Sequence, residues 1–278
     1  STTMPSGTHS IDANATDNNG NIGYSDTINV NIDSTGPEPP TNLAISLSGS
    51  DIVLSWDAST SPDLSHYAIY RSSTIDFDFI APLDTTTNLM WTDFGAGDGD
   101  WADYFYIVRA VDDSGIEDGN MNKVAKAVKQ VIDGWNLVSV PLELSDTSLT
   151  AVLQTVSWDS ARYYDAASPA DPWKVNHLSG PAAINDFSDT NHTQALWVNV
   201  DNPAGDYMIT VGTVPQMSSI DLLAGWNFVG YPSFINRTVA DALAGMPYDA
   251  VEAFDRRPHP HLPPPVVPRR TRARRHAW

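Results

Sequence analysis

The chain contains no cysteine among its 278 residues. This absence excludes a disulfide framework, a thiolate metal site and a cysteine nucleophile. Long hydrophobic runs are also missing, since no stretch approaches the roughly 18 consecutive apolar residues of a membrane-spanning helix. No basic-then-apolar signal opens the chain at Ser1, and we therefore expect a fragment of a longer secreted protein.

Motifs of the common catalytic classes are absent as well. The sequence has no Gly-x-Ser-x-Gly elbow, no Gly-rich phosphate loop and no His-Glu-x-x-His pair. A serine triad could be assembled on paper from many serines with His66, His177 or His192, but nothing distinguishes such a set from background. The sequence therefore favours a non-enzymatic protein and leaves enzymatic activity open.

Basic residues are scarce over most of the chain. The full sequence has 15 Lys+Arg and 34 Asp+Glu, which gives a net charge of -19. Residues 256–278 carry seven of these bases and no acid, so the first 255 residues stand at 8 minus 34, or -26. An acidic surface repels nucleic-acid backbones and anionic lipid, so we expect no nucleic-acid partner and no membrane insertion. Three Asn-x-Ser/Thr sequons, at Asn14, Asn191 and Asn236, are compatible with export and glycosylation.

One sequence motif occurs twice in the chain. Gly-Trp-Asn-Leu-Val-Ser-Val-Pro at residues 134–141 returns as Gly-Trp-Asn-Phe-Val-Gly-Tyr-Pro at residues 225–232, an offset of 91. After a one-residue deletion the match continues at an offset of 90, where Leu243 and Tyr248 answer Leu153 and Trp158. The second copy stops at residue 255, so the sequence predicts an internal duplication with a truncated second copy.

Composition and pattern divide the chain into three parts and a tail of residues 256–278. Residues 1–36 alternate around a polar turn, as the two strands of a hairpin do, and Pro residues then mark a linker. Residues 37–130 hold short strands at the regular spacing of a β-sandwich, and residues 131–255 hold the duplication. The strands expected after the hairpin are residues 42–47, 52–56, 66–71, 104–111, 123–128, 136–140, 162–164, 195–200 and 207–214.

Three sequences in the second part carry a resemblance: Val53-Leu54-Ser55-Trp56, Tyr67-Ala68-Ile69-Tyr70-Arg71 and Tyr104-Phe105-Tyr106-Ile107-Val108. Residues 37–130 resemble a fibronectin type III domain, and the resemblance implies that Trp56 and one of Tyr104 or Tyr106 are core residues. Residues 1–36 resemble the closing hairpin of an immunoglobulin-like repeat. The Gly-Trp-Asn pattern is similar to a repeated module of large secreted microbial surface proteins, and that resemblance implies no activity.

One short helix per repeat is expected within the duplicated part. Leu149, Val152, Leu153 and Val156 fall at the spacing of one helical face, which predicts a helix over residues 147–156. Ser145 or Asp146 is expected to cap it. The predicted fold class is therefore mainly β, with a fibronectin type III-like sandwich and a β-rich duplicated domain with short helices.

The tail, residues 256–278, contains six Pro, seven Arg, three His and no acid. This composition predicts no packed element, so we expect a disordered or non-native segment. One interpretation is a basic arm for an anionic partner. The other is a reading-frame slip or a vector scar, because the composition changes abruptly in the middle of a repeat.

Acidic loops are the candidate metal sites. Asp98, Asp100 and Asp103 alternate in a Gly-rich loop and could hold a structural calcium ion, although the Glu that closes an EF-hand loop is missing. No other cofactor is expected. The alternative is that such carboxylates close turns through hydrogen bonds to the backbone. The same two interpretations apply to two other acidic loops: Asp112, Asp113 and Asp118; Asp12, Asp17, Asn19 and Asn21. A carboxylate with two imidazoles could also hold a metal in the set His177, Asp186, Asp189 and His192, although the spacing of the histidines matches no known zinc site; the alternative there is a polar loop.

Nine Trp and ten Tyr raise the question of carbohydrate binding, because flat aromatic rings stack on sugar faces. Trp101 and Trp173 are the candidate ligand residues, since both have polar neighbours. Trp135 and Trp226 recur inside apolar runs and are expected in the core. Packing remains the alternative for all of them.

These observations favour a non-catalytic modular segment of a secreted or cell-surface protein, acting in a stalk, in adhesion or in domain presentation. Its expected partners are other domains of the parent protein, with an extracellular polysaccharide or protein as a further candidate. The alternative is an accessory C-terminal region of a secreted peptidase or glycoside hydrolase, with carbohydrate binding as one of its roles. We also expect Trp226, Phe228 and Tyr231 to be covered by the first copy or by a neighbouring molecule.

Overall fold

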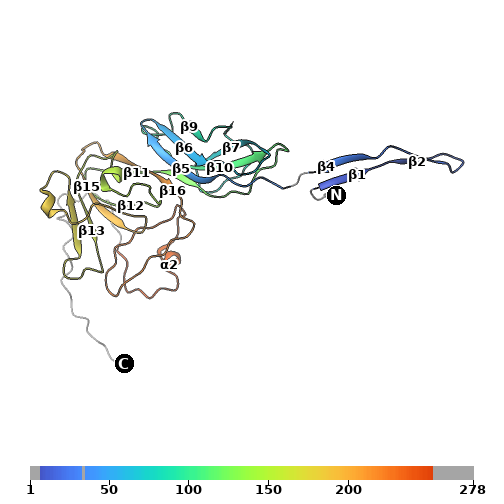
Figure 1. Cartoon of the computed structure of the whole chain (residues 1–278). Helices are drawn as coiled ribbons and strands as arrows, with labels where there is room; N and C mark the ends of the chain where they lie inside the picture. The colour runs from blue at the N-terminus through green and yellow to red at the C-terminus, as the bar shows by residue number, and fades with distance from the viewer. Residues whose placement is uncertain (1–6, 33–34, 253–278) are drawn as a thin grey trace, which may run out of the picture.

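A computed structural model describes residues 7–32 and 35–252 of the chain. The protein is mainly β, and its helices are single short turns (Figure 1). The predicted fold class is therefore confirmed. Among the described residues, no helix has both the length and the apolar character needed to cross a bilayer.

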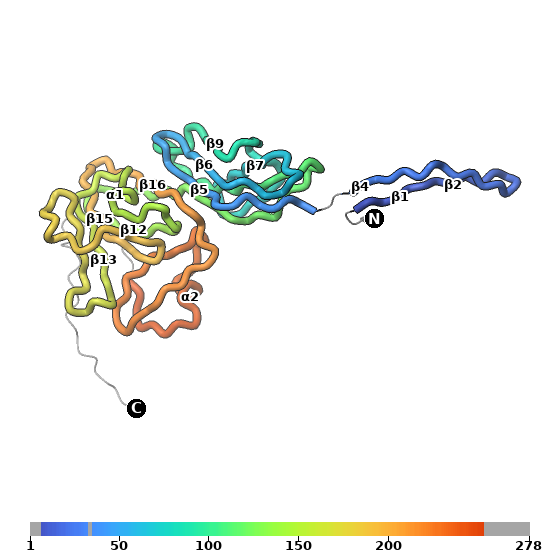
Figure 2. Tube along the Cα trace, viewed as in Figure 1, coloured from blue at the N-terminus to red at the C-terminus, as the bar shows by residue number. Residues whose placement is uncertain are grey.

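The first element is a hairpin built from two consecutive ladders. β1 (Gly7–Ile11) pairs with β4 (Ile28–Ile32), and β2 (Asn14–Thr16) pairs with β3 (Ile22–Tyr24). Asp17 closes the tip, because its carboxylate accepts hydrogen bonds from the backbone N–H groups of Asn19 and Asn21 at 2.9 Å each. The expected hairpin is confirmed, and Figure 2 shows it as an arm beside the larger body.

The next seven strands form a β-sandwich. One sheet has the order β5-β6-β9, and the other contains β8, β7, β10 and β11 in neighbouring positions. The five strands expected here are present, but β8 and β9 were not predicted because they are short and largely polar. The strands are β5 (Thr41–Ser48), β6 (Asp51–Asp57), β7 (Leu64–Ser72), β8 (Asp84–Thr86), β9 (Met90–Asp93), β10 (Tyr104–Asp112) and β11 (Val124–Val131).

Aromatic side chains fill the space between the two sheets. Trp56 is buried, and its ring meets that of Tyr67 edge-on at 5.4 Å between centroids. Tyr106 is fully buried in the same cluster, whereas Tyr104 lies at its margin. The two core positions implied by the resemblance are thus occupied by Trp56 and Tyr106.

A second unit packs on the outer face of the larger sheet. β12 (Gly134–Ser139), β15 (Ala195–Val200), β13 (Trp158–Tyr164) and β14 (Trp173–His177) form a four-stranded sheet in that order. Its inner residues share one buried cluster with Phe105, Ala125 and Ala127 of the sandwich. On the same face of β10, Ile107 and Val111 lie in a separate buried cluster against which Phe77 and Phe79 pack. The larger sheet is therefore covered on both faces, which explains why β10 is apolar along most of its length instead of alternating.

The two units also share a sheet. β16 (Asp206–Thr213) belongs by sequence to the first Gly-Trp-Asn repeat, but it pairs with β11 along that strand's whole length. It thereby becomes the edge strand of the sandwich's larger sheet. The predicted divisions at residues 36, 130 and 255 stay predictions, and a ladder now joins the parts on either side of residue 130.

The helices are shorter than expected. α1 (Leu149–Val152) and α2 (Val239–Ala242) are single turns at equivalent places in the two repeats, and a 3-10 turn spans Ala182–Ile184. The prediction that Ser145 or Asp146 caps the first helix is wrong, because Ser148 is the cap and accepts a hydrogen bond from the N–H of Ala151. Asp146 instead accepts a hydrogen bond from the N–H of Ser148.

The second copy is covered only in part. Phe228 lies against the rings of Trp173 and Trp197 of the first copy, and Val229 forms a bridge with Gln194. Trp226 and Tyr231 remain 48% and 40% exposed. The expected contact with the first copy is present at Phe228, and none of the three side chains is fully exposed. The expectation that Trp226 is a core residue is wrong. The predictions for residues 256–278 lie outside the described residues.

Candidate functional site

The acidic loop of residues 94–103 crosses from one sheet of the sandwich to the other, and the carboxylates of Asp100 and Asp103 accept hydrogen bonds from neighbouring groups. Asp100 accepts hydrogen bonds from the N–H of Ala102 at 2.9 Å and from the hydroxyl of Tyr104 at 2.8 Å. Asp103 accepts one at 2.7 Å from the N–H of Val128. Burial alone would raise the pKa of Asp100, but these hydrogen bonds and the nearby Lys126 and Arg71 lower it.

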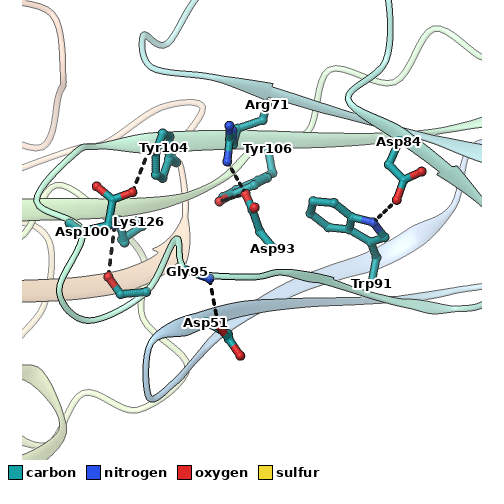
Figure 3. Close-up of polar contacts among 11 residues, drawn as sticks. Asp51, Arg71, Asp84, Trp91, Asp93, Gly95, Asp100, Tyr104, Tyr106 and Lys126 are labelled. Atoms are coloured by element: carbon teal, nitrogen blue, oxygen red, sulfur yellow. Dashed lines mark hydrogen bonds and ion pairs between the residues drawn. The ribbon is translucent and has the colours of Figure 1, made fainter.

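Lys126 anchors the same loop from β11 (Figure 3). Its side chain is fully buried, and its ammonium donates to the carbonyl oxygens of Asp100 at 2.7 Å and Gly97 at 3.4 Å. Burial lowers the pKa of Lys126, and the charges of Asp100 and Asp103 oppose that shift. A buried ammonium needs such partners, so the loop and the lysine stabilise each other.

A second polar group, centred on Asp93, joins the two sheets. Asp93 is on β9, and its carboxylate accepts hydrogen bonds from Arg71 at 2.7 Å and Tyr106 at 2.9 Å, both on the opposite sheet. Burial alone would lower the pKa of Arg71, but the bond to Asp93 and its charge raise it. Burial, followed by the charge of Asp93, raises the pKa of Tyr106. This partly exposed ion pair links the two sheets of the sandwich, with side-chain exposures of 30% for Arg71 and 10% for Asp93.

The three predicted calcium residues do not form a ligand cluster in this arrangement. Within residues 7–32 and 35–252, no three His, Asp or Glu side chains converge in a way that could hold a metal ion. Asp98 takes part through its backbone, whose N–H donates to the carbonyl of Gly49. Calcium binding by Asp98, Asp100 and Asp103 stays a prediction.

The other acidic loops show the same use of carboxylates. Asp112 accepts hydrogen bonds from the N–H groups of Ser114 and Ile116, and Asp118 accepts from those of Ala110 and Asn120. Burial raises the pKa of Asp118, and its backbone donors oppose that shift. These bonds close turns at the end of β10, so Asp112 and Asp118 have a structural role there.

The His/Asp stretch of residues 177–192 is organised in a similar way. The carboxylate of Asp186 accepts a hydrogen bond from the N–H of Val175. Asp189 accepts from the hydroxyls of Thr147 at 3.2 Å and Ser188 at 2.5 Å. The two carboxylates thus hold the loop against β14 and the start of α1.

The two predicted ligand tryptophans lie in different surroundings. Trp101 is 48% exposed and stacks on Tyr207 at 4.2 Å between centroids with an interplanar angle of 10°. One face of its indole is therefore covered by β16. Trp173 is half-buried and meets Tyr164 edge-on at 5.4 Å. The structure keeps the two residues on separate elements, one on the sandwich loop and one on β14.

An aromatic face that the sequence did not predict lies on the outer side of the four-stranded sheet. The ladder registers place Trp135 and Trp197 on one face with Arg162, Tyr164 and Trp173. The guanidinium of Arg162 lies 5.0 Å from the centroid of the Trp135 ring. Period-two alternation along each strand could have identified this face, but only the pairing of the strands brings its members together.

The Gly-Trp-Asn motif has a structural explanation. Gly134 has φ +81°, a conformation that side chains with a Cβ rarely adopt. The side chain of Asn136 then accepts a hydrogen bond from the N–H of Ile132 at 3.0 Å and donates to the carbonyls of Ile132 and Gly134 at 2.7 and 2.9 Å. The motif therefore closes the turn that starts each repeat.

The chain was compared with known families, curated proteins and solved structures. No family model matches the chain, and no curated protein matches it. Among solved structures, the chain is similar to one described as the crystal structure of a Fn3-like protein from Clostridium thermocellum. The identity is 30%, the match covers 30% of this chain and 83% of that one, and the TM-score is 0.26. The sandwich described above is established by its strand order and not by this similarity.

Proposed function

We propose that this chain is a non-catalytic modular segment of a secreted or cell-surface protein, where it spaces and presents other domains. In this proposal residues 37–130 are a fibronectin type III module, preceded by the end of an immunoglobulin-like repeat and followed by the Gly-Trp-Asn module. The observation that carries it is the β11–β16 ladder, because it joins two consecutive modules through one sheet.

The ladder supports a stiff connection between the modules. It pairs eight residues of β11 with eight of β16, from Val124↔Thr213 to Val131↔Asp206. The buried cluster beneath it contains side chains of both modules, including Phe105 from the sandwich and Val198 from the second unit. Domains joined only by a linker move independently by default, whereas a shared sheet and core resist such motion.

The absence of cysteine makes a direct test practical. Spin labels at Ser46→Cys and Ala170→Cys report the separation of the two units by electron–electron resonance, and both positions are exposed. We expect a single distance distribution as narrow as that of the control pair Ser46→Cys and Ser114→Cys, which lies within the sandwich. A much broader distribution between the units than within one would contradict a spacer role.

Carbohydrate binding is the second candidate, favoured by the exposure of Trp101 beside Tyr207. Stacked aromatic side chains at a surface offer a flat apolar platform to a sugar ring. The test is sedimentation with insoluble polysaccharides for the parent chain, Trp101→Ala and Trp173→Ala. Loss of binding in Trp101→Ala would support the candidate, and absence of binding by the parent chain would remove it.

Structural calcium at Asp98, Asp100 and Asp103 is a separate proposal with its own measurement. Binding to the folded state alone would raise the melting temperature in excess calcium, by mass action. An unchanged melting temperature would contradict calcium binding at this loop. The Asp98→Asn variant is the control, because a rise in melting temperature that it keeps comes from calcium bound at another site.

A further inference from the structure

The second repeat reproduces the local structure of the first. Thr238 caps α2 through its hydroxyl, which accepts a hydrogen bond from the N–H of Asp241, as Ser148 does for α1 with Ala151. Asn227 repeats the three hydrogen bonds of Asn136: it accepts from the N–H of Leu223 and donates to the carbonyls of Leu223 and Gly225. Residues 225–246 thus have the local form of a Gly-Trp-Asn repeat.

The burial of the two copies is opposite. Val138, Leu149 and Val156 in the first copy are 3%, 2% and 8% exposed. Their equivalents Val229, Val239 and Met246 are 42%, 52% and 39% exposed. Further along, Trp158 is 7% exposed and its counterpart Tyr248 is 50% exposed. We name Val229, Val239, Met246, Tyr248 and Val251 the open face of the second repeat.

In the first copy, two later strands provide the cover. β15 pairs with β12 on one side and β13 on the other, and its Leu196 and Val198 lie in the same buried cluster as Leu149 and Val156. β16 closes the other side of that cluster through Met208. Thr155 is tied to β16 by two bonds, since its hydroxyl donates to the carbonyl of Tyr207 at 2.8 Å and accepts from the N–H of Ile209 at 2.9 Å.

The open face is continuous with an existing interface. The N–H of Gly230 donates to the carbonyl of Thr193 at 2.8 Å, just before β15.

We propose that the open face is a docking surface for two β-strands of the same kind as residues 195–213, the strand pair that completes a Gly-Trp-Asn repeat. The recognising chemistry is that of the first copy: alternating aliphatic side chains on one face, a Pro/Gly turn, and backbone groups that extend a ladder. Bound strands of this kind bury the five side chains of the open face. This proposal does not depend on the spacer role.

The test adds the missing strands in two ways. A synthetic peptide of residues 190–214 is the probe in trans. In cis, a chain in which a second copy of residues 163–214 follows Glu252 supplies the same strands. In both cases we expect hydrogen exchange of the amides in residues 227–251 to slow at least about tenfold, because buried and hydrogen-bonded amides are protected. The same peptide and the same graft with Leu196→Asp and Val198→Asp are the matched controls.

The proposal is overturned if neither the peptide nor the graft protects residues 227–251, or if the Asp-substituted forms protect them equally. Concentration-dependent dimerisation of the parent chain that Val239→Asp abolishes, with no effect of the peptide, would instead assign the open face to a second copy of this chain. Met217→Asp, which changes a side chain that is 88% exposed and outside the open face, should behave as the parent in every assay.

Discussion

At the scale of single residues, Asn136 and Asn227 have the same bonding and different surroundings. Both side chains close a turn over a glycine with positive φ, through three hydrogen bonds to the backbone. Asn136 is fully buried, whereas Asn227 lies in a segment that is mostly exposed. Water can replace the lost hydrogen-bond partners at Asn227 but not at Asn136. Replacing the asparagine by alanine should therefore lower the free energy of unfolding by different amounts at the two positions.

We therefore expect Asn136→Ala to lower the free energy of unfolding by about 1–3 kcal/mol, because it removes a fully buried amide and leaves partly buried backbone groups without these bonds. Asn227→Ala is the matched control in the second copy and should cost clearly less. Urea denaturation of both variants measures the difference. Equal costs would mean that burial does not determine the strength of this motif.

Tyr106 provides a prediction about pH. Its pKa is raised in the folded protein by burial and by the charge of Asp93, whereas an unfolded tyrosine ionises near pH 10. Above about pH 10 the unfolded state binds fewer protons than the folded state, so stability falls as pH rises. Tyr106→Phe removes the Tyr106 hydroxyl, and with it one contribution to this fall in stability.

The slope of unfolding free energy against pH between about pH 10 and 11 should therefore be shallower in Tyr106→Phe than in the parent chain. It should not vanish, because the pKa values of Tyr70 and Tyr104 are also raised. Tyr24→Phe changes an exposed side chain and is the control. An unchanged slope in Tyr106→Phe would show that its hydroxyl is not buried as described.

At the scale of elements, β16 belongs by sequence to the first Gly-Trp-Asn repeat but pairs with a strand of the sandwich. It follows β15 by a short turn, but its ladder partner is β11 and not any strand of its own repeat. Met208 points to the cluster between the units, and Val211 packs against the core of the sandwich. The edge strand β16 therefore contributes side chains both to the core of the sandwich and to the cluster between the two units.

Thr210 lies in the middle of β16, opposite Ala127. Thr210→Pro should lower the free energy of unfolding by about 3 kcal/mol or more, because proline cannot donate to the ladder and fixes φ. Thr210→Ala keeps the backbone N–H and is the control for the loss of the side chain. A proline variant no less stable than the alanine variant would mean that β16 does not hold the edge of the sheet.

At the scale of the whole molecule, the larger sheet has buried side chains on both faces. Tyr106 and Val108 face the core of the sandwich, and Phe105 and Ala125 face the second unit. Removal of the second unit exposes the latter pair and leaves the edge of β11 unpaired, which invites aggregation. The two units are therefore expected to fold as one cooperative body.

Calorimetry tests this expectation. A chain of residues 35–214 should unfold in a single transition, and a fragment of residues 35–131 should melt at a lower temperature or self-associate. Two separate transitions, with the fragment as stable as the sandwich in the longer chain, would contradict a shared core.

Sequence alone was sufficient for the features that depend on local pattern. Period-two alternation located the long strands, and the Gly-Trp-Asn motif located the duplication. The resemblance identified Trp56 as a core position and left Tyr104 and Tyr106 as alternatives, between which the structure selects Tyr106. The short strands β8 and β9 and the cap at Ser148 were not found, because they depend on neighbours distant in sequence and on the exact end of a single helical turn.

The amino-acid sequence determined that the chain is mainly β and that one repeat unit occurs twice, because these properties follow from side-chain period and identity. Only the tertiary structure decided that β16 joins the sandwich, that Asp93 pairs with Arg71 across two sheets, and that one copy of the repeat is buried while the other is open. The reason is physical: burial and strand pairing belong to contacts between distant segments, and two nearly identical segments can differ in every such contact.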